Sequence, residues 1–231
     1  MKVIEAELSS PIGELYLERL RIHINDSYRG LPMLKFPEDL RVIEELMWEL
    51  EINVVLEIGL WRGGGALWFR DRLRTLAEYG RIDQPLVVAV DRNISEAQSA
   101  LMGVDPNYAK TIKLVESDIR SPSVREAVCR HIPADARVLV IDDSAHRYDT
   151  SLATLTTFAD LVPVGGYVLI EDGHRDIEGM LPPEISGEAR GVLDAIEDFL
   201  AGDGADRFVR RRDQERYVLT SHPGGWIQRV R

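Results

Sequence analysis

Thiols, long apolar runs and a secretion signal are scarce or absent in this sequence. Its 231 residues include a single cysteine, Cys129. One cysteine excludes an internal disulfide and any metal cluster built from several thiolates, and we expect it to be a small buried residue on a helix. No apolar run approaches the roughly 20 residues that span a bilayer, and the N-terminus, with Glu5 and Glu7, lacks the pattern of a signal peptide. These absences predict a cytoplasmic protein that makes no membrane contact.

Positive charge is also in short supply. The 28 Lys and Arg residues face 39 Asp and Glu residues, which gives a net charge of −11. Such a chain repels a phosphate backbone unless its basic residues are gathered into one stripe. The one basic cluster, at 207 and 210–212, is interrupted by Phe208 and Val209 and is typical of a solvated strand edge. We therefore expect a small-molecule partner and no nucleic acid.

Five short runs rich in Val, Ile and Leu predict the strands of a buried sheet. Continuous apolar runs suit strands that are covered on both faces, so the sheet should be mainly parallel with helices on both sides. The runs are 53–58, 86–90, 111–115, 137–141 and 167–170, and helices are expected at 64–79, 95–101, 123–131, 150–159 and 190–200. Residues 217–220 and 226–230 flank a Ser-His-Pro-Gly-Gly turn, which predicts a closing antiparallel hairpin. The fold class is α/β with a twisted, mainly parallel sheet.

The N-terminal segment precedes this sheet and has a different character. A helix is expected from Glu38 to Leu50, because four apolar residues recur there at helical spacing. They are Leu40, Ile43, Met47 and Leu50. We expect residues 1–50 to form a helical cap or an oligomer surface, so that the protein is a homo-oligomer, and residues 51–231 to form the cofactor-binding domain.

The most informative stretch is Val-Val-Leu-Glu-Ile-Gly-Leu-Trp-Arg-Gly-Gly-Gly at 54–65. Glycines let backbone N–H groups approach a ligand, and the following helix directs its positive end to the same place. A dinucleotide fingerprint reads G-x-G-x-x-G. Here the spacing is E-x-G-x-x-x-G, which resembles the first motif of S-adenosylmethionine-dependent methyltransferases; the alternative is a strand that merely ends in a glycine-rich turn. The expected cofactor-binding residues of this loop are Glu57, Gly59, Trp61, Arg62, Gly63, Gly64 and Gly65.

Two further acids fit a cofactor that carries a ribose. Asp91 ends the second strand, 34 residues after Glu57, where a carboxylate accepts hydrogen bonds from ribose hydroxyls. NAD enzymes use the same device, so an NAD-dependent oxidoreductase stays open as an alternative that the glycine spacing opposes. Asp118 ends the third strand, where methyltransferases often place a residue beside the adenine. A helix cap or a turn residue is the alternative for Asp118.

A cluster of acids follows two more strands. Asp142 with Asp143, and Glu171 with Asp172, fall at strand ends that a parallel sheet brings together. Carboxylates so close repel one another, so a cation should lie between them, and hard oxygen ligands favour Mg²⁺ or Ca²⁺. The alternative is that these acids cap helices or pair with arginines.

Histidines near these acids are candidates for proton transfer. His146 lies three residues after Asp143, and imidazole titrates in the range that suits removal of a proton from a hydroxyl group. His146 is the expected general base and His174 a weaker candidate; a structural role at a helix entrance is the alternative. His174-x-Asp176 with His222 also imitates the iron motif of oxygenases, but the β-barrel context of that motif is absent.

Taken together, these motifs resemble the cephalosporin hydroxylase family. The matching segments are Tyr28-Arg-Gly30 with Lys35-x-Pro37-x-Asp39, Glu57-Ile-Gly-Leu-Trp-Arg-Gly63-Gly64, Asp143-Ser-Ala-His146, Val164-Gly-Gly-Tyr-Val-Leu-Ile-Glu171-Asp172, and Asp213-x-Glu-Arg-Tyr-Val-Leu-Thr220 leading to Pro223-Gly-Gly-Trp. Members are Rossmann-like proteins that look like S-adenosylmethionine-dependent methyltransferases. They are related to metal-dependent O-methyltransferases that modify macrolide sugars.

This resemblance implies a class I methyltransferase fold and O-methyl transfer to a hydroxyl of a sugar or natural product. S-adenosylmethionine and Mg²⁺ are the implied cofactors, with Asp143, Glu171 and Asp172 as metal ligands and His146 as the base. Two departures matter: Ala145 stands where the family tends to have a second acid, and Gly65 where it tends to have Ser or Thr. Because Ala145 removes one potential ligand, a catalytically silent binding or assembly protein remains an alternative.

Overall fold

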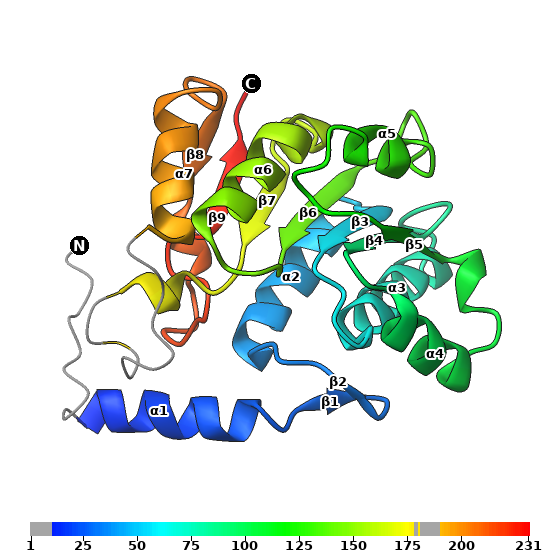
Figure 1. The fold of residues 1–231 in the computed structure, drawn as a ribbon, viewed down its shortest axis with the longest axis horizontal. Helices are drawn as coiled ribbons and strands as arrows, with labels where there is room; N and C mark the ends of the chain where they lie inside the picture. The colour runs from blue at the N-terminus through cyan, green and yellow to red at the C-terminus, as the bar shows by residue number, and fades with distance from the viewer. Residues whose placement is uncertain (1–10, 178–179, 181–189) are drawn as a thin grey trace.

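The computed structural model describes residues 11–177, 180 and 190–231. In this part of the chain one sheet has seven strands in the order β5-β4-β3-β6-β7-β9-β8 (Figure 1). The strands are β3 (Val54–Ile58), β4 (Leu86–Asp91), β5 (Ile112–Glu116), β6 (Val138–Asp142), β7 (Tyr167–Ile170), β8 (Phe208–Arg210) and β9 (Trp226–Arg229). The first five are parallel to one another, whereas β9 runs antiparallel to both β7 and β8. The expected α/β fold is confirmed.

Helices cover both faces of the sheet, as continuous apolar strands require. One core joins α2 (Pro37–Glu49), α3 (Gly64–Glu78) and α4 (Ser95–Val104) to strand residues such as Val55. The other core joins α5 (Val124–Cys129), α6 (Tyr148–Phe158) and α7 (Val192–Ala201) to the alternate residues, such as Leu56. Cys129 ends α5 but is half-buried, so its helical place is confirmed and its full burial is wrong.

The strand order places the site. The chain runs outward from β3 to β4 and β5 and then returns to pair β6 with the other side of β3. Ligands of open α/β sheets bind at such a reversal, outside the carboxyl ends of the strands. Gly59 follows β3, Asp91 ends β4 and Asp143 follows β6, so the candidate residues from distant parts of the chain meet at this edge.

The N-terminal segment contains a helix and a small hairpin that the sequence did not predict. Helix α1 (Pro11–His23) leads into the antiparallel strands β1 (Ser27–Tyr28) and β2 (Leu31–Pro32). Helix α2, which the sequence predicted, packs Ile43 and Met47 into the same core as the sheet. The separation of residues 1–50 from the rest stays a prediction, and residues 1–10 lie outside the described part of the chain.

The C-terminal hairpin differs from the expectation. The antiparallel edge is confirmed, but β9 pairs with β7 and with β8, and residues 217–220 form no strand. The reason is a competing set of polar bonds: Thr220 Oγ1 donates to Asp39 Oδ1 at 2.6 Å, and the Ser221 N–H donates to Asp39 Oδ2 at 3.0 Å. The basic cluster lies at the edge of the sheet, as expected: Arg210 ends the edge strand β8, and the other arginines of the cluster flank this strand. No helix in the described residues has the length and apolar character that a membrane crossing needs.

Candidate active site

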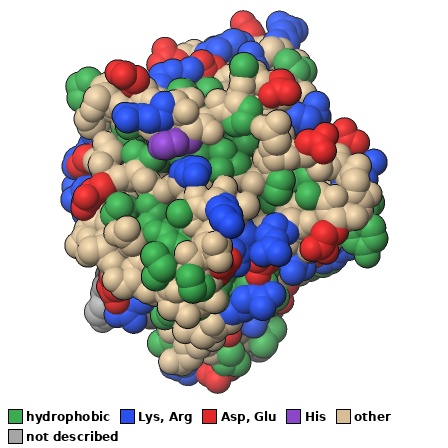
Figure 2. All heavy atoms as spheres, turned by 90° about the vertical axis from the view of Figure 1, so that its right-hand side faces the viewer, with side chains coloured by type: hydrophobic (Ala, Val, Ile, Leu, Met, Phe, Trp, Pro, Cys, Tyr) green, Lys and Arg blue, Asp and Glu red, His purple; other side chains and the backbone are tan. Residues whose placement is uncertain are grey.

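A cavity of about 620 Å³ opens at the carboxyl ends of β3, β4 and β6. Its walls come from the loops that follow these strands and from the C-terminal turn of α1, which contributes Leu20 and His23. Seven of the expected site residues line it: Gly59, Trp61, Asp91, Asp118, Asp143, His146 and Asp172. Figure 2 shows the side of the molecule that bears α4, where basic side chains gather near the middle among acidic and hydrophobic ones. This side therefore carries no uniform charge.

The glycines of the loop after β3 are explained by close packing. Gly59 has φ +95°, and an added Cβ would overlap the carbonyl group of Asp143 in the loop after β6. An added Cβ at Gly64 would overlap the carbonyl of Pro32 in β2, and one at Gly65 would overlap the Glu57 carboxyl group. The residues Glu57, Gly63, Gly64 and Gly65 do not line the cavity. The glycine run thus brings β2, β3 and β6 together beneath the site.

Arg62 and Trp61 lie side by side on the outer part of this loop. The Arg62 guanidinium makes an ion pair with Glu96 at 2.7 Å and lies 5.4 Å from the centre of the Trp61 ring. Arg62 does not line the cavity, whereas half-exposed Trp61 does. The structure therefore directs Arg62 toward the start of α4, and Trp61 contributes an apolar surface to the cavity.

Asp91 bridges the cavity and the loop. Its Oδ2 accepts hydrogen bonds from the backbone N–H groups of Leu60 at 2.9 Å and Trp61 at 3.2 Å, and its Oδ1 accepts one from Asn93 at 3.2 Å. A carboxylate has about four lone-pair sites, so it can also accept hydrogen bonds from a ligand. Asp91 is placed where the sequence predicted a ribose-binding carboxylate.

Asp118 is held by an arginine. Arg120 donates to its two carboxylate oxygens at 3.0 and 2.7 Å and also reaches Asp149 at 2.6 Å. These hydrogen bonds from Arg120 hold the pKa of Asp118 well below its ordinary value. The carboxylate is therefore engaged with Arg120 at the cavity wall.

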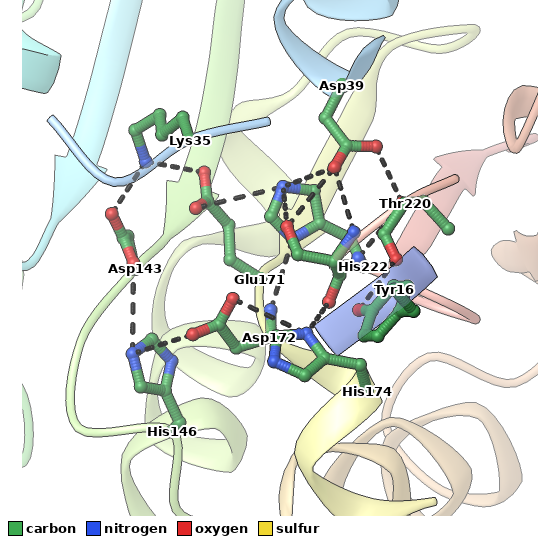
Figure 3. A network of polar contacts seen from close by, with 11 residues as sticks. Tyr16, Lys35, Asp39, Asp143, His146, Glu171, Asp172, His174, Thr220 and His222 are labelled. Atoms are coloured by element: carbon green, nitrogen blue, oxygen red, sulfur yellow. Dashed lines mark hydrogen bonds and ion pairs between the residues drawn. The ribbon is translucent and has the colours of Figure 1, made fainter. Parts of the chain in front are cut away.

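A lysine whose role sequence reasoning missed lies between two of the acids (Figure 3). Lys35 Nζ lies 2.6 Å from Asp143 Oδ2 and 2.7 Å from Glu171 Oε1, and its side chain is 3% exposed. Burial lowers the pKa of Lys35, but the carboxylates of Asp143 and Glu171 raise it by more, so the net shift is upward and the ammonium stays charged. Lys35 stands two residues before the first residue of α2, in the Lys-x-Pro-x-Asp motif, which is the signal that could have found it.

His146 lies between two carboxylates at the cavity wall (Figure 3). Its Nε2 is 3.4 Å from Asp172 Oδ2 and 3.8 Å from Asp143 Oδ1. Burial raises the pKa of Asp172, but the charges of His146 and His174 outweigh it and the net shift is downward. An imidazole at this position can act as a general base toward a group bound in the cavity.

A second polar network holds the backbone of Asp172 in place. The Asp172 N–H donates to His222 Nδ1 at 3.1 Å, and His222 Nε2 lies 3.5 Å from Asp39 Oδ2. Asp39 and His222 are buried, and Asp172 has the unusual φ of +60° that this contact helps to hold. Sequence reasoning missed the role of Asp39 because nearly two hundred residues separate it from its partners.

The oxygenase motif is not assembled. His174 Nδ1 contacts the carbonyl of Ser221 at 2.6 Å, while Asp176 Oδ2 accepts a hydrogen bond from the Leu193 N–H at 2.8 Å. Across the described residues, no group of three His, Cys, Asp or Glu side chains could hold a metal ion as arranged. His174 and Asp176 therefore bind different segments of the chain and do not face a common metal position.

The magnesium ligands expected from the sequence have suitable donor atoms, but their side chains are not arranged around one metal position. Asp143, Glu171 and Asp172 offer the oxygen donors that Mg²⁺ prefers, and all three follow neighbouring strands. Asp143 and Glu171 both contact the Lys35 ammonium, whereas Asp172 contacts His146. An incoming metal ion would have to displace the ammonium.

The strand order and the cavity at the reversal between β3 and β6 define a protein of the methyltransferase-type α/β fold. Solved structures share it: one described as "cmcI-D160 Mg-SAM" has a TM-score of 0.64 at 23% identity over 90% of this chain and 78% of its own. An O-methyltransferase from Bacillus cereus in complex with SAH has a TM-score of 0.54 at 13% identity, over 87% of this chain and 80% of its own.

The sequence comparison specifies the family. The model of the family Rhamnosyl O-methyltransferase/CmcI matches residues 21–230, and the chain belongs to this family. Relatives include the rhamnosyl O-methyltransferases of Mycobacterium tuberculosis (strain ATCC 25618 / H37Rv), 27% identical over 88% of this chain and 78% of the relative, and of Mycobacterium leprae (strain TN), 27% identical over 88% and 82%. The resemblance to the cephalosporin hydroxylase family is confirmed.

Proposed function

We propose that this protein transfers the methyl group of S-adenosylmethionine to a hydroxyl group of a sugar or a sugar-bearing natural product. The observation that carries the proposal is the family match over 21–230, joined to a cavity that both the cofactor acid Asp91 and the candidate base His146 line. Relatives in the family are named rhamnosyl O-methyltransferases. A structural neighbour is described with Mg and SAM.

The cofactor would lie along the carboxyl ends of β3 and β4. Asp91 would accept hydrogen bonds from the ribose hydroxyls, and the backbone after Gly59 would face the amino-acid end. Trp61 and Ile119 give the cavity apolar walls, and the adenine would lie near Asp118. This placement directs the sulfonium methyl group toward the half of the cavity that His146 lines.

His146 would act as the general base. Its Nε2 would take the proton of the acceptor hydroxyl, and the oxygen would attack the methyl carbon as the carbon–sulfur bond breaks, giving the methyl ether and S-adenosylhomocysteine. The carboxylates of Asp143 and Asp172 would stabilise the imidazolium. The protein would contribute alignment and charge stabilisation to this in-line transfer.

Mg²⁺ is the proposed second cofactor. Asp143, Glu171 and Asp172 would supply its oxygen ligands, and when bound it would lower the pKa of the acceptor hydroxyl. Ala145 brings no carboxylate, so Asp142 is the possible substitute for the missing ligand.

We also propose that the protein works in the cytoplasm as a homo-oligomer through its N-terminal cap, residues 1–50. Among the described residues of this segment, the exposed large apolar side chains are Leu15 (59%), Ile22 (53%) and Ile24 (63%), with Trp48 (42%) on α2. Exposed apolar groups on one helix and the turn after it are typical of a surface that a second chain covers. Light scattering of the wild type and of a Leu15→Ser/Ile22→Ser variant tests this, because the variant should have a lower mass.

A labelled-methyl assay tests the enzymatic function. Purified protein is incubated with S-adenosylmethionine labelled in its methyl group and with a panel of rhamnosides and other glycosides, with and without Mg²⁺. Transfer of label to a glycoside is the expected result. Binding of the cofactor without transfer to any acceptor would favour the silent binding protein, and binding of NAD⁺ instead would favour the oxidoreductase.

A further inference from the structure

The Lys35 ammonium lies among the carboxylates that we propose as metal ligands, Asp143, Glu171 and Asp172. Its ammonium lies between Asp143 Oδ2 at 2.6 Å and Glu171 Oε1 at 2.7 Å (Figure 3). Glu171 is 1% exposed, so its charge needs a partner inside the protein. A buried carboxylate and a buried ammonium are each costly alone. The Lys35 ammonium and its two carboxylates therefore stabilise one another in the folded protein.

A third carboxyl group, that of Glu57, lies near the same ammonium. Glu57 is 2% exposed, and its Oε2 has no hydrogen-bond partner in the part of the chain that the structure describes. Burial is the main cause that raises the pKa of Glu57 far above its ordinary value, and the charge of Lys35 acts in the opposite direction. The ionised form of Glu57 would therefore be stabilised if the Lys35 ammonium came closer.

Gly65 leaves open the space between these two groups. A side chain at this position would overlap Oε1 of Glu57 and would lie 3.2 Å from Cε of Lys35. Both groups thus border the volume that a side chain at residue 65 would fill. The long, flexible stem of a lysine allows its ammonium to cross such a distance by rotation.

We propose that Lys35 is a displaceable internal cation, which neutralises Asp143 and Glu171 in the metal-free protein and moves toward Glu57 when a divalent cation binds. The inference rests on the proposed function in one respect, that a divalent cation uses these carboxylates. Two positive charges cannot share the two carboxylates at close range. The metal affinity is therefore set by competition with Lys35 as well as by the ligands.

Manganese binding without cofactor or acceptor tests this directly. Free Mn²⁺ is measured by electron paramagnetic resonance during titration of the wild type, Lys35→Met and the matched control Lys110→Met. The control removes the same charge from an exposed position. Lys35→Met should bind Mn²⁺ roughly tenfold more tightly or better, since every 1.4 kcal/mol is tenfold, and Lys110→Met should match the wild type. Glu57→Gln should bind Mn²⁺ more weakly than the wild type, because the displaced ammonium loses the carboxylate toward which it would move.

Thermal unfolding gives an independent readout. Lys35→Met should melt below the wild type in EDTA, because it removes the ammonium that contacts Asp143 and Glu171, and Mn²⁺ should restore most of the loss. If Lys35→Met does not fold, Lys35→Gln replaces it, since an amide can donate to both carboxylates. Equal Mn²⁺ affinity in the wild type and the Lys35 variant overturns the proposal, as does absence of Mn²⁺ binding by both. Neither outcome depends on methyl transfer, so failure of the proposed function is recorded separately by the labelled-methyl assay.

Discussion

Oδ2 of Asp91 accepts a hydrogen bond from the backbone N–H of Leu60 over 2.9 Å. This bond links the end of β4 to the loop that follows β3, on the wall of the cavity. The same carboxylate therefore shapes the loop and faces the ligand. It couples the geometry of the cofactor loop to the group expected to bind the ribose.

Asp91→Asn should weaken the binding of S-adenosylhomocysteine by about 10- to 100-fold. A hydrogen bond to a charged group contributes about 1.5–3 kcal/mol, and the amide keeps the shape of the side chain. Titration calorimetry measures the change. Asp118→Asn is the control and should have a smaller effect, because Arg120 already engages that carboxylate. Equal affinity of Asp91→Asn and the wild type would remove Asp91 from the ribose site.

His146→Gln should lower kcat by roughly 10²–10⁴-fold, the usual contribution of a general base. Cofactor affinity should not change, since the proposed mechanism has His146 contact the acceptor hydroxyl and not the cofactor. Steady-state kinetics and calorimetry on the same preparation separate the two effects. His131→Gln is the matched control because His131 does not line the cavity. A variant with wild-type kcat would assign the base to another residue.

Gly64→Ala should destabilise the protein by about 1–3 kcal/mol, the cost of overpacking a filled site. Its Cβ would overlap the carbonyl of Pro32. Gly103→Ala in α4 is the opposite case, because nothing lies within 4 Å of an added Cβ, and it should stabilise by about 0.5–1 kcal/mol. Urea unfolding of both variants checks the two signs. A neutral Gly64→Ala would show that β2 does not pack against this loop.

The free energy of unfolding should fall with acidification in a way that depends on His23. Burial lowers the pKa of His23 in the folded protein. The His23 ring packs edge-on against the Phe36 ring, with 4.9 Å between the ring centres. The unfolded chain therefore takes up the proton first, so this contribution is complete above about pH 6.5 and is lost as the pH falls through the lower folded pKa. His23→Phe keeps the ring contact and should lose less stability over that range. Parallel pH profiles of the two proteins would contradict the assignment.

Local patterns in the sequence predicted the sheet and its edge. Apolar runs identified all five parallel strands, and four of the acids at or after their ends line one cavity: Asp91, Asp118, Asp143 and Asp172. These predictions succeeded because burial on both faces and a position at a strand end are properties of short segments. Gly59 was also recognised, although the structure adds its close contact with the Asp143 backbone.

Contacts between distant segments could not be predicted in this way. Lys35 is 136 residues from Glu171 in sequence, and Asp39 is 181 residues from Thr220. Nothing in the periodicity of either segment records its partner. For the same reason residues 217–220 were expected to form a strand, whereas the buried Asp39 carboxylate holds their end in a loop. The sequence also predicts that acceptor specificity lies in the N-terminal segment and in the loop at 173–190, and residues 178–179 and 181–189 of that loop lie outside the described part of the chain.

Calorimetric titration with S-adenosylhomocysteine tests the central claim most directly. The wild-type protein should bind one molecule per chain, and NAD⁺ should give no heat under the same conditions. Binding of NAD⁺ in place of S-adenosylhomocysteine, or no heat with either compound, would contradict a methyl-donor site at the carboxyl ends of β3 and β4.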